Sequence, residues 1–273
     1  IKDRIVKYIV EEAERSGKLR SGMTIMEATT GNTGIALAML GHRKGYRVRL
    51  FAPENIAPSI RTLFDVFGAE VVWCDPRGGV RGAMLSAEAA AASDSSCFFA
   101  NQFANPANVA AHYETTGPEI LADLPQVDVL IAGVGTGGTV TGVGKRLKEA
   151  NPSVKVIGVE PYPGQLVQGL TSFHEGYVPP ILDRRILSGK MVVRSADAFI
   201  ASRELLAREG IFCGISAGAA LHVARRWAKR IHSGNIVVIM ADSGWKYLGV
   251  EHWDMALSAA EELRERMEDT FWW

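Results

Sequence analysis

The stretch Val127–Gly144, which reads VDVLIAGVGTGGTVTGVG, carries the strongest structural signal in the chain. Its first half, residues 127–134, has the length and the β-branched content of a buried strand. The turn Gly135-Thr136-Gly137-Gly138-Thr139 follows directly, and residues 140–150 can form a helix. Glycines between a strand and a helix leave backbone N–H groups uncovered at the helix N-terminus, where they can hold a phosphate group. The sequence therefore predicts a phosphate loop, and a tight turn without a ligand is the alternative.

Two familiar phosphate loops do not match this turn. The P-loop of nucleotide-triphosphate enzymes ends in Gly-Lys-Ser/Thr, whereas Gly138-Thr139-Val140 has no lysine. The dinucleotide pattern Gly-x-Gly-x-x-Gly can be placed on Gly133, Gly135 and Gly138. However, the acidic residue expected about 20 residues later has no candidate that closes a clear second strand before Glu160.

The composition excludes several classes of function. Lysine plus arginine and aspartate plus glutamate both total 30 in 273 residues, so no overall field attracts nucleic acid or an anionic membrane. No apolar run approaches the roughly 20 residues that span a bilayer. The three cysteines (Cys74, Cys97 and Cys213) have neither metal-binding nor disulfide spacing. We expect a soluble, cytoplasmic protein without a nucleic-acid or membrane partner. Because the chain begins at Ile1 and directly in a helical pattern, we also expect that an upstream segment is missing.

The rest of the chain alternates between strand-like and helical segments, which predicts parallel sheets covered by helices. An irregular stretch at residues 162–180 is long for a loop and therefore a candidate functional segment. A charged helix is expected at 253–267, followed by the aromatic tail Phe271–Trp273. The expected strands are 23–27, 46–52, 70–74, 96–100, 155–160, 191–194 and 235–241, and the expected helices are 3–16, 35–40, 58–67, 83–92, 109–113, 197–209 and one ending at 230.

A second strand–turn–helix corner carries hydroxyl groups instead of glycines alone. Residues 28–34 read Ala-Thr-Thr-Gly-Asn-Thr-Gly, and hydroxyls together with helix-start N–H groups suit a carboxylate. The alternative is an ordinary N-cap at Thr29 or Thr30. Gln102 follows another strand and could add an amide donor, although a structural role is the more frequent one.

Two further residues are candidates by position. Lys2 is expected at a helix N-terminus, where the helix dipole disfavours its charge and should lower its pKa; the alternative is a solvated surface lysine. Ser216 lies in a third glycine-rich corner, residues 210–220, where it could simply cap a helix. Gly214 to Gly218 also fits the Gly-x-Ser-x-Gly pattern of serine hydrolases, but no histidine follows in a triad context. Cys213 reads as a small core residue.

Taken together and in order, these segments resemble the cysteine synthase branch of the pyridoxal-phosphate enzymes. Residues 1–4 (IKDR) are similar to the end of that family's lysine motif. Thr29–Gly34 is similar to its Thr-Ser-Gly-Asn-Thr-Gly loop, and Gly135–Thr139 to its phosphate loop. Three further segments are similar to motifs of the same family, and with them the resemblance covers the whole chain. They are Gln102–Asn108, Gly214–Ala219 and Asp242-Ser243-Gly244.

The resemblance implies an α/β fold of two doubly wound domains like the tryptophan synthase β-subunit, with its N-terminal part missing. Residues 1–33 and 97–273 would form the large cofactor-binding domain, and 34–96 a small domain that closes over the substrate. Lys2 would form the internal aldimine and act as the catalytic base. Asn32 and Ser216 would contact the cofactor ring, and Gly135, Thr136, Gly137, Gly138 and Thr139 its phosphate. Thr29, Thr30, Thr33 and Gln102 would bind the substrate carboxylate.

The implied reaction makes L-cysteine from an activated serine and a sulfur nucleophile through an aminoacrylate. Trp245-Lys246-Tyr247 resembles the branch that uses O-phosphoserine, but that branch's arginine is absent from Leu170–His174, so acetate and phosphate stay open as leaving groups. The sulfur donor could be a small molecule or a protein thiocarboxylate, and a homodimer is the family's habit. The alternatives are a serine/threonine dehydratase, a cystathionine β-synthase, an NAD(P)-binding oxidoreductase and a non-catalytic binding protein.

Overall fold

The computed structural model describes residues 1–249 and Trp253. Apart from Trp253, the expected helix 253–267 lies outside the described residues, as does the tail Phe271–Trp273. The chain divides into two compact units, residues 1–108 and the residues from 109 onward, which we describe separately. None of the helices in the described ranges is long and apolar enough to span a membrane.

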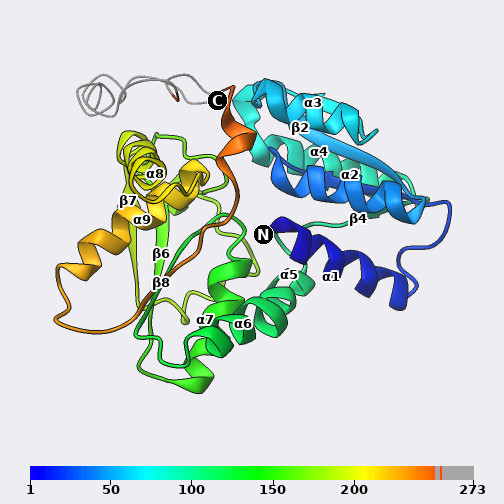
Figure 1. The fold of residues 1–273 in the computed structure, drawn as a ribbon. Helices are drawn as coiled ribbons and strands as arrows, with labels where there is room; N and C mark the ends of the chain where they lie inside the picture. Colours follow the sequence, from blue (N-terminus) through cyan, green and yellow to red (C-terminus); the bar gives the residue numbers. More distant parts are fainter. Residues whose placement is uncertain (250–252, 254–273) are drawn as a thin grey trace. The chain divides into compact units, whose positions relative to one another are not determined.

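The first unit is a four-stranded parallel sheet with helices packed on it (Figure 1). The strand order is β3-β2-β1-β4, so the first strand of the chain lies inside the sheet. The helix α1 packs against α2, and α2 and α4 pack on the strands. The strands are β1 (Thr24–Ala28), β2 (Arg47–Pro53), β3 (Glu70–Cys74) and β4 (Cys97–Phe99), and the helices are α1 (Lys2–Arg15), α2 (Asn32–Lys44), α3 (Pro58–Val66) and α4 (Gly79–Ser93), with a 3-10 turn at Pro76–Gly78.

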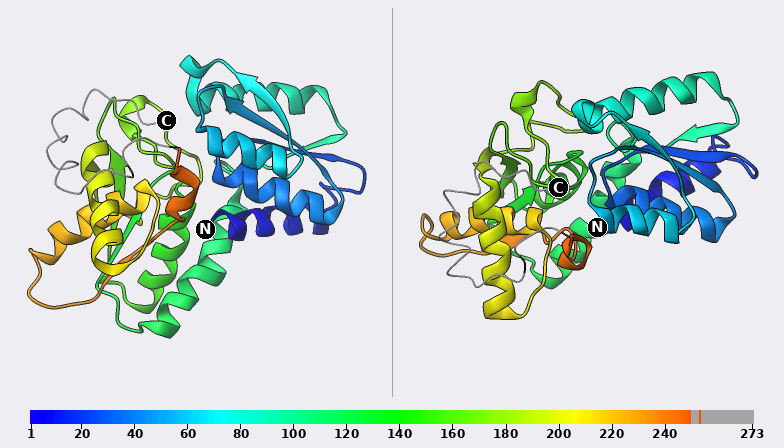
Figure 2. Two further views of the ribbon diagram at one scale, coloured as in Figure 1. Left: turned by 45° about the horizontal axis from the view of Figure 1, so that its top comes forward. Right: turned by 90° about the horizontal axis from the view of Figure 1, so that it is seen from above.

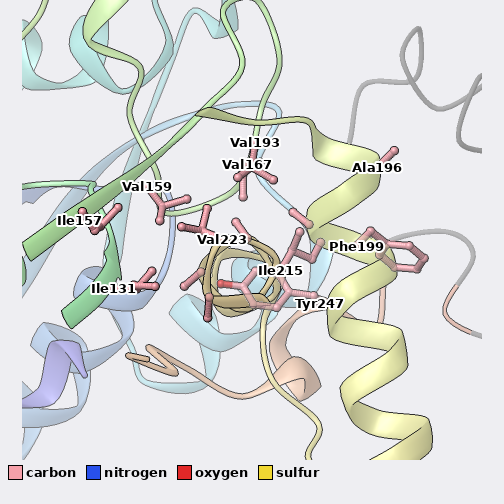
Figure 3. Packing of buried hydrophobic residues seen from close by; sticks show 14 of the residues in the cluster. Ile131, Ile157, Val159, Val167, Val193, Ala196, Phe199, Ile215, Val223 and Tyr247 are labelled. Carbon is pink, nitrogen blue, oxygen red and sulfur yellow. The ribbon is translucent and has the colours of Figure 1, made fainter. Parts of the chain in front are cut away.

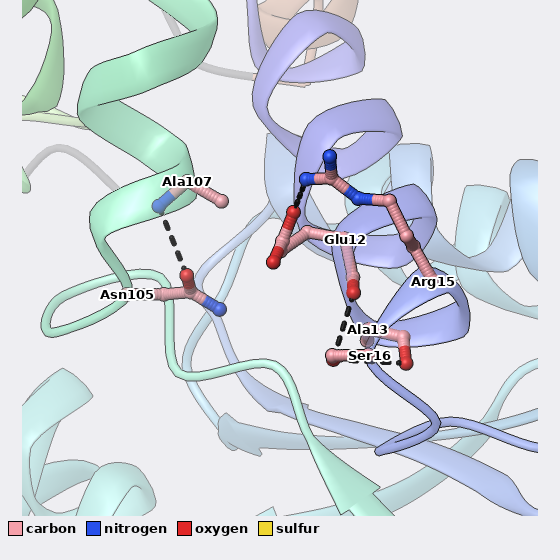
Figure 4. Close-up of polar contacts among 6 residues, drawn as sticks. All are labelled: Glu12, Ala13, Arg15, Ser16, Asn105 and Ala107. Carbon is pink, nitrogen blue, oxygen red and sulfur yellow. Dashed lines mark hydrogen bonds and ion pairs between the residues drawn. The ribbon is translucent and has the colours of Figure 1, made fainter.

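Local polar contacts define where two helices end or begin (Figure 4). At the end of α1 the Ser16 hydroxyl donates to the Glu12 carbonyl oxygen at 2.8 Å, and Arg15 pairs with the Glu12 carboxylate. At the start of α5 (Pro106–Ala111) the Asn105 side-chain oxygen accepts from the Ala107 N–H at 3.0 Å. The Ser16 and Asn105 contacts satisfy backbone groups that a helix end leaves unpaired.

The second unit repeats the same sheet topology. Its parallel strands have the order β7-β6-β5-β8. Figure 2 shows further views of both units. The strands are β5 (Val129–Gly133), β6 (Lys155–Pro161), β7 (Gly189–Val193) and β8 (Ile236–Val238), and the helices are α6 (Gly117–Asp123), α7 (Gly138–Ala150), α8 (Ser195–Glu209) and α9 (Ile215–Ala228), with a π-helical segment at His112–Thr116 and 3-10 turns at Phe173–Glu175 and Gly244–Tyr247.

Both faces of the second sheet are buried, which explains why the apolar run at residues 127–134 does not alternate with polar residues. Val129 and Ile131 of β5 face one core, together with Phe199 of α8 and Val223 of α9 (Figure 3). Leu130 and Ala132 face the other core. Alternate residues of one strand therefore enter two different cores, as expected for a parallel sheet covered on both sides.

The expected α/β class with parallel sheets is confirmed. Several boundaries differ: α2 begins at Asn32 instead of residue 35, α4 begins at Gly79 instead of residue 83, and the last strand spans only three of the seven expected residues. The helix expected at 109–113 is replaced by α5, which ends at Ala111, and by the π-helical segment. The division of the chain into a large domain and a small closing domain, 34–96, concerns motion and stays a prediction.

Candidate active site

The predicted phosphate loop joins β5 to α7 and is built from backbone. Gly137 has φ +84°, a left-handed conformation that side-chain-bearing residues rarely adopt. A Cβ atom on Gly135 would lie 2.4 Å from the carbonyl oxygen of Gly169, which leaves no room for a side chain. α7 begins at Gly138, so its first N–H groups lie at this turn. The turn thus has the geometry of an anion site at a helix N-terminus.

The predicted phosphate loop also contains two threonine hydroxyl groups, from Thr136 and Thr139. Thr136 is buried, and its Oγ1 accepts from the Gly138 N–H at 3.3 Å. Thr139 Oγ1 lies 3.1 Å from Nε2 of His112, whose Nδ1 lies 3.0 Å from Thr116 Oγ1. His112 is fully buried and belongs to the π-helical segment. The second threonine of the loop is therefore held by a buried chain of polar side chains.

The hydroxyl-rich corner lies at the end of β1 in the first unit. The buried Thr29 side chain accepts from the N–H groups of Gly31 (3.1 Å) and Gly34 (3.3 Å), which fixes the turn into α2. The Thr33 hydroxyl donates to the Gln102 side-chain oxygen at 2.6 Å, and both residues are buried. Thr30 is exposed. This corner brings together residues that are 69 positions apart.

A buried carboxyl group lies beneath this corner and was not among the predicted site residues. Glu27 is fully buried in β1, and its two oxygens accept from the N–H groups of Ala28 (2.8 Å) and Gln102 (2.9 Å). Burial raises the pKa of Glu27 to about 8, while the hydrogen bonds from the Gln102 and Ala28 amides act in the opposite direction. The sequence signal was available: a glutamate stands inside an otherwise apolar strand immediately before the polar turn.

Ser216 lies in the first turn of α9 and is buried. The N–H of the preceding Gly214 donates to the carbonyl oxygen of Asp242 at 3.1 Å, and a Cβ atom at Gly214 would lie 2.1 Å from Asp242 Oδ1. The hydroxyl of Tyr247 donates to Asp242 Oδ2. Hence the Gly214–Ser216 corner and the Asp242-Ser243-Gly244 segment, predicted separately, meet in the second unit. Cys213 is buried beside Ser202, and burial raises its pKa, so its thiol is a poor nucleophile.

Lys2 is the first residue of α1, as predicted. At the other end of this helix Glu14 contacts Lys44 at 2.7 Å and Tyr46 at 2.9 Å, so α1 and α2 end side by side. Since the two helices pack together and run in the same direction (Figure 1), Lys2 begins α1 at the end of the unit where Asn32 begins α2. Lys2 is thus placed toward the edge of the sheet that carries the hydroxyl-rich corner.

The structure gathers the predicted site residues into two groups, one in each unit. Because the carboxyl ends of parallel strands share one edge of a sheet, each group lies at such an edge. That the two groups meet around one ligand stays a prediction. The first group is Lys2, Thr29, Thr30, Asn32, Thr33 and Gln102, and the second is Gly135, Thr136, Gly137, Gly138, Thr139 and Ser216.

Comparison with known proteins identifies the class. The family model for pyridoxal-phosphate-dependent enzymes matches residues 1–242, so the chain belongs to that family. Within it, the chain is 37% identical over 259 residues to cysteine synthase B of Escherichia coli strain K12, covering 92% of this chain and 85% of that protein. It therefore belongs to the cysteine synthase family.

Solved structures agree with this assignment. The cysteine synthase of Entamoeba histolytica superposes with a TM-score of 0.86 at 32% identity, covering 97% of this chain and 83% of that one. An O-ureido-L-serine synthase gives a TM-score of 0.86 at 36% identity, covering 95% and 83%. The predicted fold type, cofactor class and enzyme family are thus confirmed.

The residues of the second unit fit pyridoxal phosphate. The crowded backbone at Gly135 and the left-handed Gly137 form a turn in which backbone N–H groups take the place of side chains, and these are donors for a phosphate. The buried Ser216 hydroxyl is a neutral partner for a pyridine nitrogen. Within the described ranges no group of three or more His, Cys, Asp or Glu residues could hold a metal ion.

Proposed function

We propose that this protein makes L-cysteine by replacing the β-substituent of an activated L-serine with a sulfur nucleophile, using pyridoxal phosphate. The observation that carries the proposal is the backbone-built turn Gly135–Thr139 at the N-terminus of α7, in a chain 37% identical to a cysteine synthase. The hydroxyl-rich corner at Thr29–Gly34 adds the second requirement, a set of donors suited to an amino-acid carboxylate.

Each group of residues has a distinct task in this proposal. Gly135 to Thr139 would hold the cofactor phosphate and Asn32 and Ser216 would contact its ring. Lys2 would bond to the cofactor until the substrate's amino group replaces it. When bound, pyridoxal phosphate supplies an electron sink for the pair that remains on the substrate Cα after proton loss. Ser216 would offer the ring nitrogen a neutral hydroxyl, which would not enforce a pyridinium and would favour loss of a β-substituent over longer-lived carbanion chemistry.

The chain's own side chains provide binding and proton transfer. Thr29, Thr30, Thr33 and Gln102 bind the substrate carboxylate and so orient the Cα–H bond. Lys2 takes the α-proton as general base. Closure of residues 34–96 excludes water, which would otherwise compete with the sulfur nucleophile.

We infer that acetate, not phosphate, is the preferred leaving group. Without a helix N-terminus assigned to it, the phosphate of a substrate is bound most strongly by cationic side chains such as arginine. The segment Leu170–His174 has no arginine, and the nearby Lys190 is already paired with the fully buried Glu160 at 3.3 Å. His174 lies 3.5 Å from that same lysine. Trp245-Lys246-Tyr247 is the feature that supports O-phosphoserine instead.

Steady-state assays with sulfide decide between these substrates. We expect the purified protein with pyridoxal phosphate to form L-cysteine from O-acetyl-L-serine with a higher kcat/KM than from O-phospho-L-serine. The reverse order would restore the O-phosphoserine assignment. Formation of pyruvate from either substrate, without cysteine when sulfide is present, would favour a dehydratase and contradict the proposal.

The resemblance also supports a homodimer in the cytoplasm. The sulfur donor is sulfide or another small molecule in the simplest form of this proposal, with a protein thiocarboxylate as the alternative. Light scattering on the purified chain tests the dimer. Assays with sulfide, thiosulfate and a thiocarboxylated carrier protein compare the donors.

A further inference from the structure

The structure contains a buried carboxyl group whose contacts join the two chain segments of the hydroxyl-rich corner. Glu27 Oε1 accepts from the N–H of Ala28, which leads into the turn after β1. Its Oε2 accepts from the N–H of Gln102, which follows β4. One side chain thus satisfies a backbone donor at the end of β1 and another in the segment that follows the adjacent strand β4.

The segment after β4 turns sharply before it reaches Gln102. Asn101 has φ +48°, the single positive φ of a non-glycine residue in the part of the chain that the structure describes. Asparagine is among the few side-chain-bearing residues that adopt this left-handed conformation readily. Asn101 turns the chain so that Gln102 lies beneath the end of β1. Glu27 holds the Gln102 N–H, and the Asn108 side-chain amide donates to the Gln102 carbonyl oxygen at 2.8 Å.

The Gln102 side chain is consequently fixed in one orientation. Its Nε2 donates to the Ala28 carbonyl oxygen at 3.2 Å, and its Oε1 accepts from the Thr33 hydroxyl at 2.6 Å. An amide nitrogen carries two donors. The second Nε2–H therefore remains for a ligand, and its direction depends on where the Gln102 backbone is held.

We propose that Glu27 is a positioning residue: it fixes Gln102 and the turn after Ala28 relative to each other, and so sets how tightly the amino-acid carboxylate is bound. The inference rests on the proposed function, because it assumes that this corner binds that carboxylate. A carboxyl group is suited to this task because it offers two acceptor oxygens, and glutamine at the same position would present an NH2 group to one of the two backbone N–H donors.

The first measurement tests the contact itself and does not depend on catalysis. In 15N-labelled protein the amide signals of Ala28 and Gln102 should shift together as pH rises, with one shared midpoint near the Glu27 pKa of about 8. The variant E27Q should lose this transition. Different midpoints for the two amides, or a transition that persists in E27Q, would overturn the proposal.

The second measurement isolates the carboxylate. Binding of L-serine and of ethanolamine, which lacks the carboxylate, is followed by the absorbance change of the holoenzyme. We expect E27Q to weaken L-serine binding roughly tenfold, as for loss of one hydrogen bond near a charged ligand, and to leave ethanolamine binding unchanged. The KM for the activated serine should rise by a similar factor while kcat stays near its original value.

The matched control is E14Q in the same unit. Glu14 also accepts from two donors, Lys44 and Tyr46, but these precede β2 and therefore lie at the opposite edge of the sheet. If E27Q and E14Q affect L-serine equally, or if E27Q weakens ethanolamine as much as L-serine, Glu27 has only a general structural role. If the wild-type protein binds neither cofactor nor L-serine, the proposed function fails, whereas the shared amide transition still reports on the contact.

Discussion

The two corners of the candidate site occupy equivalent positions in their sheets but are built from different groups. β1 and β5 stand at the same place in the strand orders β3-β2-β1-β4 and β7-β6-β5-β8. After β5 the turn is made of backbone, with a left-handed Gly137 and no room for a side chain at Gly135. After β1 the turn is organised by buried side chains that bond to one another, such as Thr33 and Gln102.

This difference matches the two anions that we assign to the corners. A phosphate presents three oxygens, and the convergent N–H groups of a glycine turn can surround it. A carboxylate is planar and smaller, and a few oriented side-chain donors suffice to fix its direction. We therefore expect the corner after β5 to depend more on its glycines than on its hydroxyls, and we expect loss of a hydroxyl to disturb ligand orientation more in the corner after β1.

The largest effect is expected from substitution of Lys2, the proposed general base. Lys2→Ala removes the proposed base and the bond to the cofactor, so we expect kcat to fall by about 10³-fold or more. The visible absorbance of the lysine–cofactor bond should disappear, although cofactor still binds through the phosphate loop. Lys7→Ala, at an exposed position of the same helix, is the control. A Lys2→Ala variant with normal turnover would refute the assignment.

The second-largest effect is expected from a glycine substitution in the corner after β5, which is built from backbone. Gly135→Ala brings a Cβ atom within 2.4 Å of the Gly169 carbonyl oxygen, and the loop must shift. A shift of about 1 Å at such a site can cost roughly 10²-fold in activity, and we expect a similar loss of affinity for pyridoxal phosphate. Fluorescence titration of the PLP-free protein measures that affinity. Gly82→Ala, where a Cβ atom would meet no atom within 4 Å, should leave it unchanged.

A pair of hydroxyl deletions compares the corners directly. Thr33→Val removes the donor to Gln102 and leaves a buried amide oxygen without it, which costs about 1–3 kcal/mol. We expect KM for the activated serine to rise roughly tenfold with unchanged cofactor affinity. Thr136→Val should do the reverse, weakening the cofactor and sparing KM. Equal effects of both variants on both quantities would show that the corners do not act on separate anions.

Features that depend on neighbouring residues, such as the glycine turn, could be predicted from the sequence. Features that depend on contacts between distant residues could not. Gly135 and Gly137 marked their turn because glycine is required there, by the nearby Gly169 carbonyl oxygen at Gly135 and by the left-handed φ at Gly137. The π-helical segment His112–Thr116 was not predicted; it packs against α7, where a Cβ atom on Gly142 would approach the Val109 carbonyl oxygen to 2.4 Å. That close approach exists only after folding.

The candidate site also contains both kinds of feature, those visible in the local sequence and those that depend on distant contacts. Thr29, Thr33 and Gln102 were proposed from composition and resemblance, and the structure brings them together. The role of Glu27 could not be assigned beforehand, because its second acceptor bond goes to a residue 75 positions away. A charged residue in a buried strand is visible in the sequence, but its partner is not.

The last prediction concerns stability, not activity, and compares the two edges of the first sheet. Burial raises the pKa of Glu27 from 4.5 to about 8. Below pH 4.5 the folded and the unfolded chain both hold the proton. Between pH 4.5 and 8 the unfolded chain releases it while the folded chain keeps it, so stability falls as pH rises. The free energy of unfolding of the wild-type protein should therefore decrease relative to that of E27Q by about 1.4 kcal/mol per pH unit in this window.

Urea unfolding between pH 5 and 8 measures this difference, with E14Q as the reference for loss of a carboxylate at the opposite edge. Parallel curves for wild type and E27Q would mean that Glu27 is ionised in the folded protein throughout. The buried carboxyl would then hold Gln102 as an anion beside the carboxylate it helps to bind, and the repulsion between the two charges would have to be offset by the backbone N–H groups of Ala28 and Gln102.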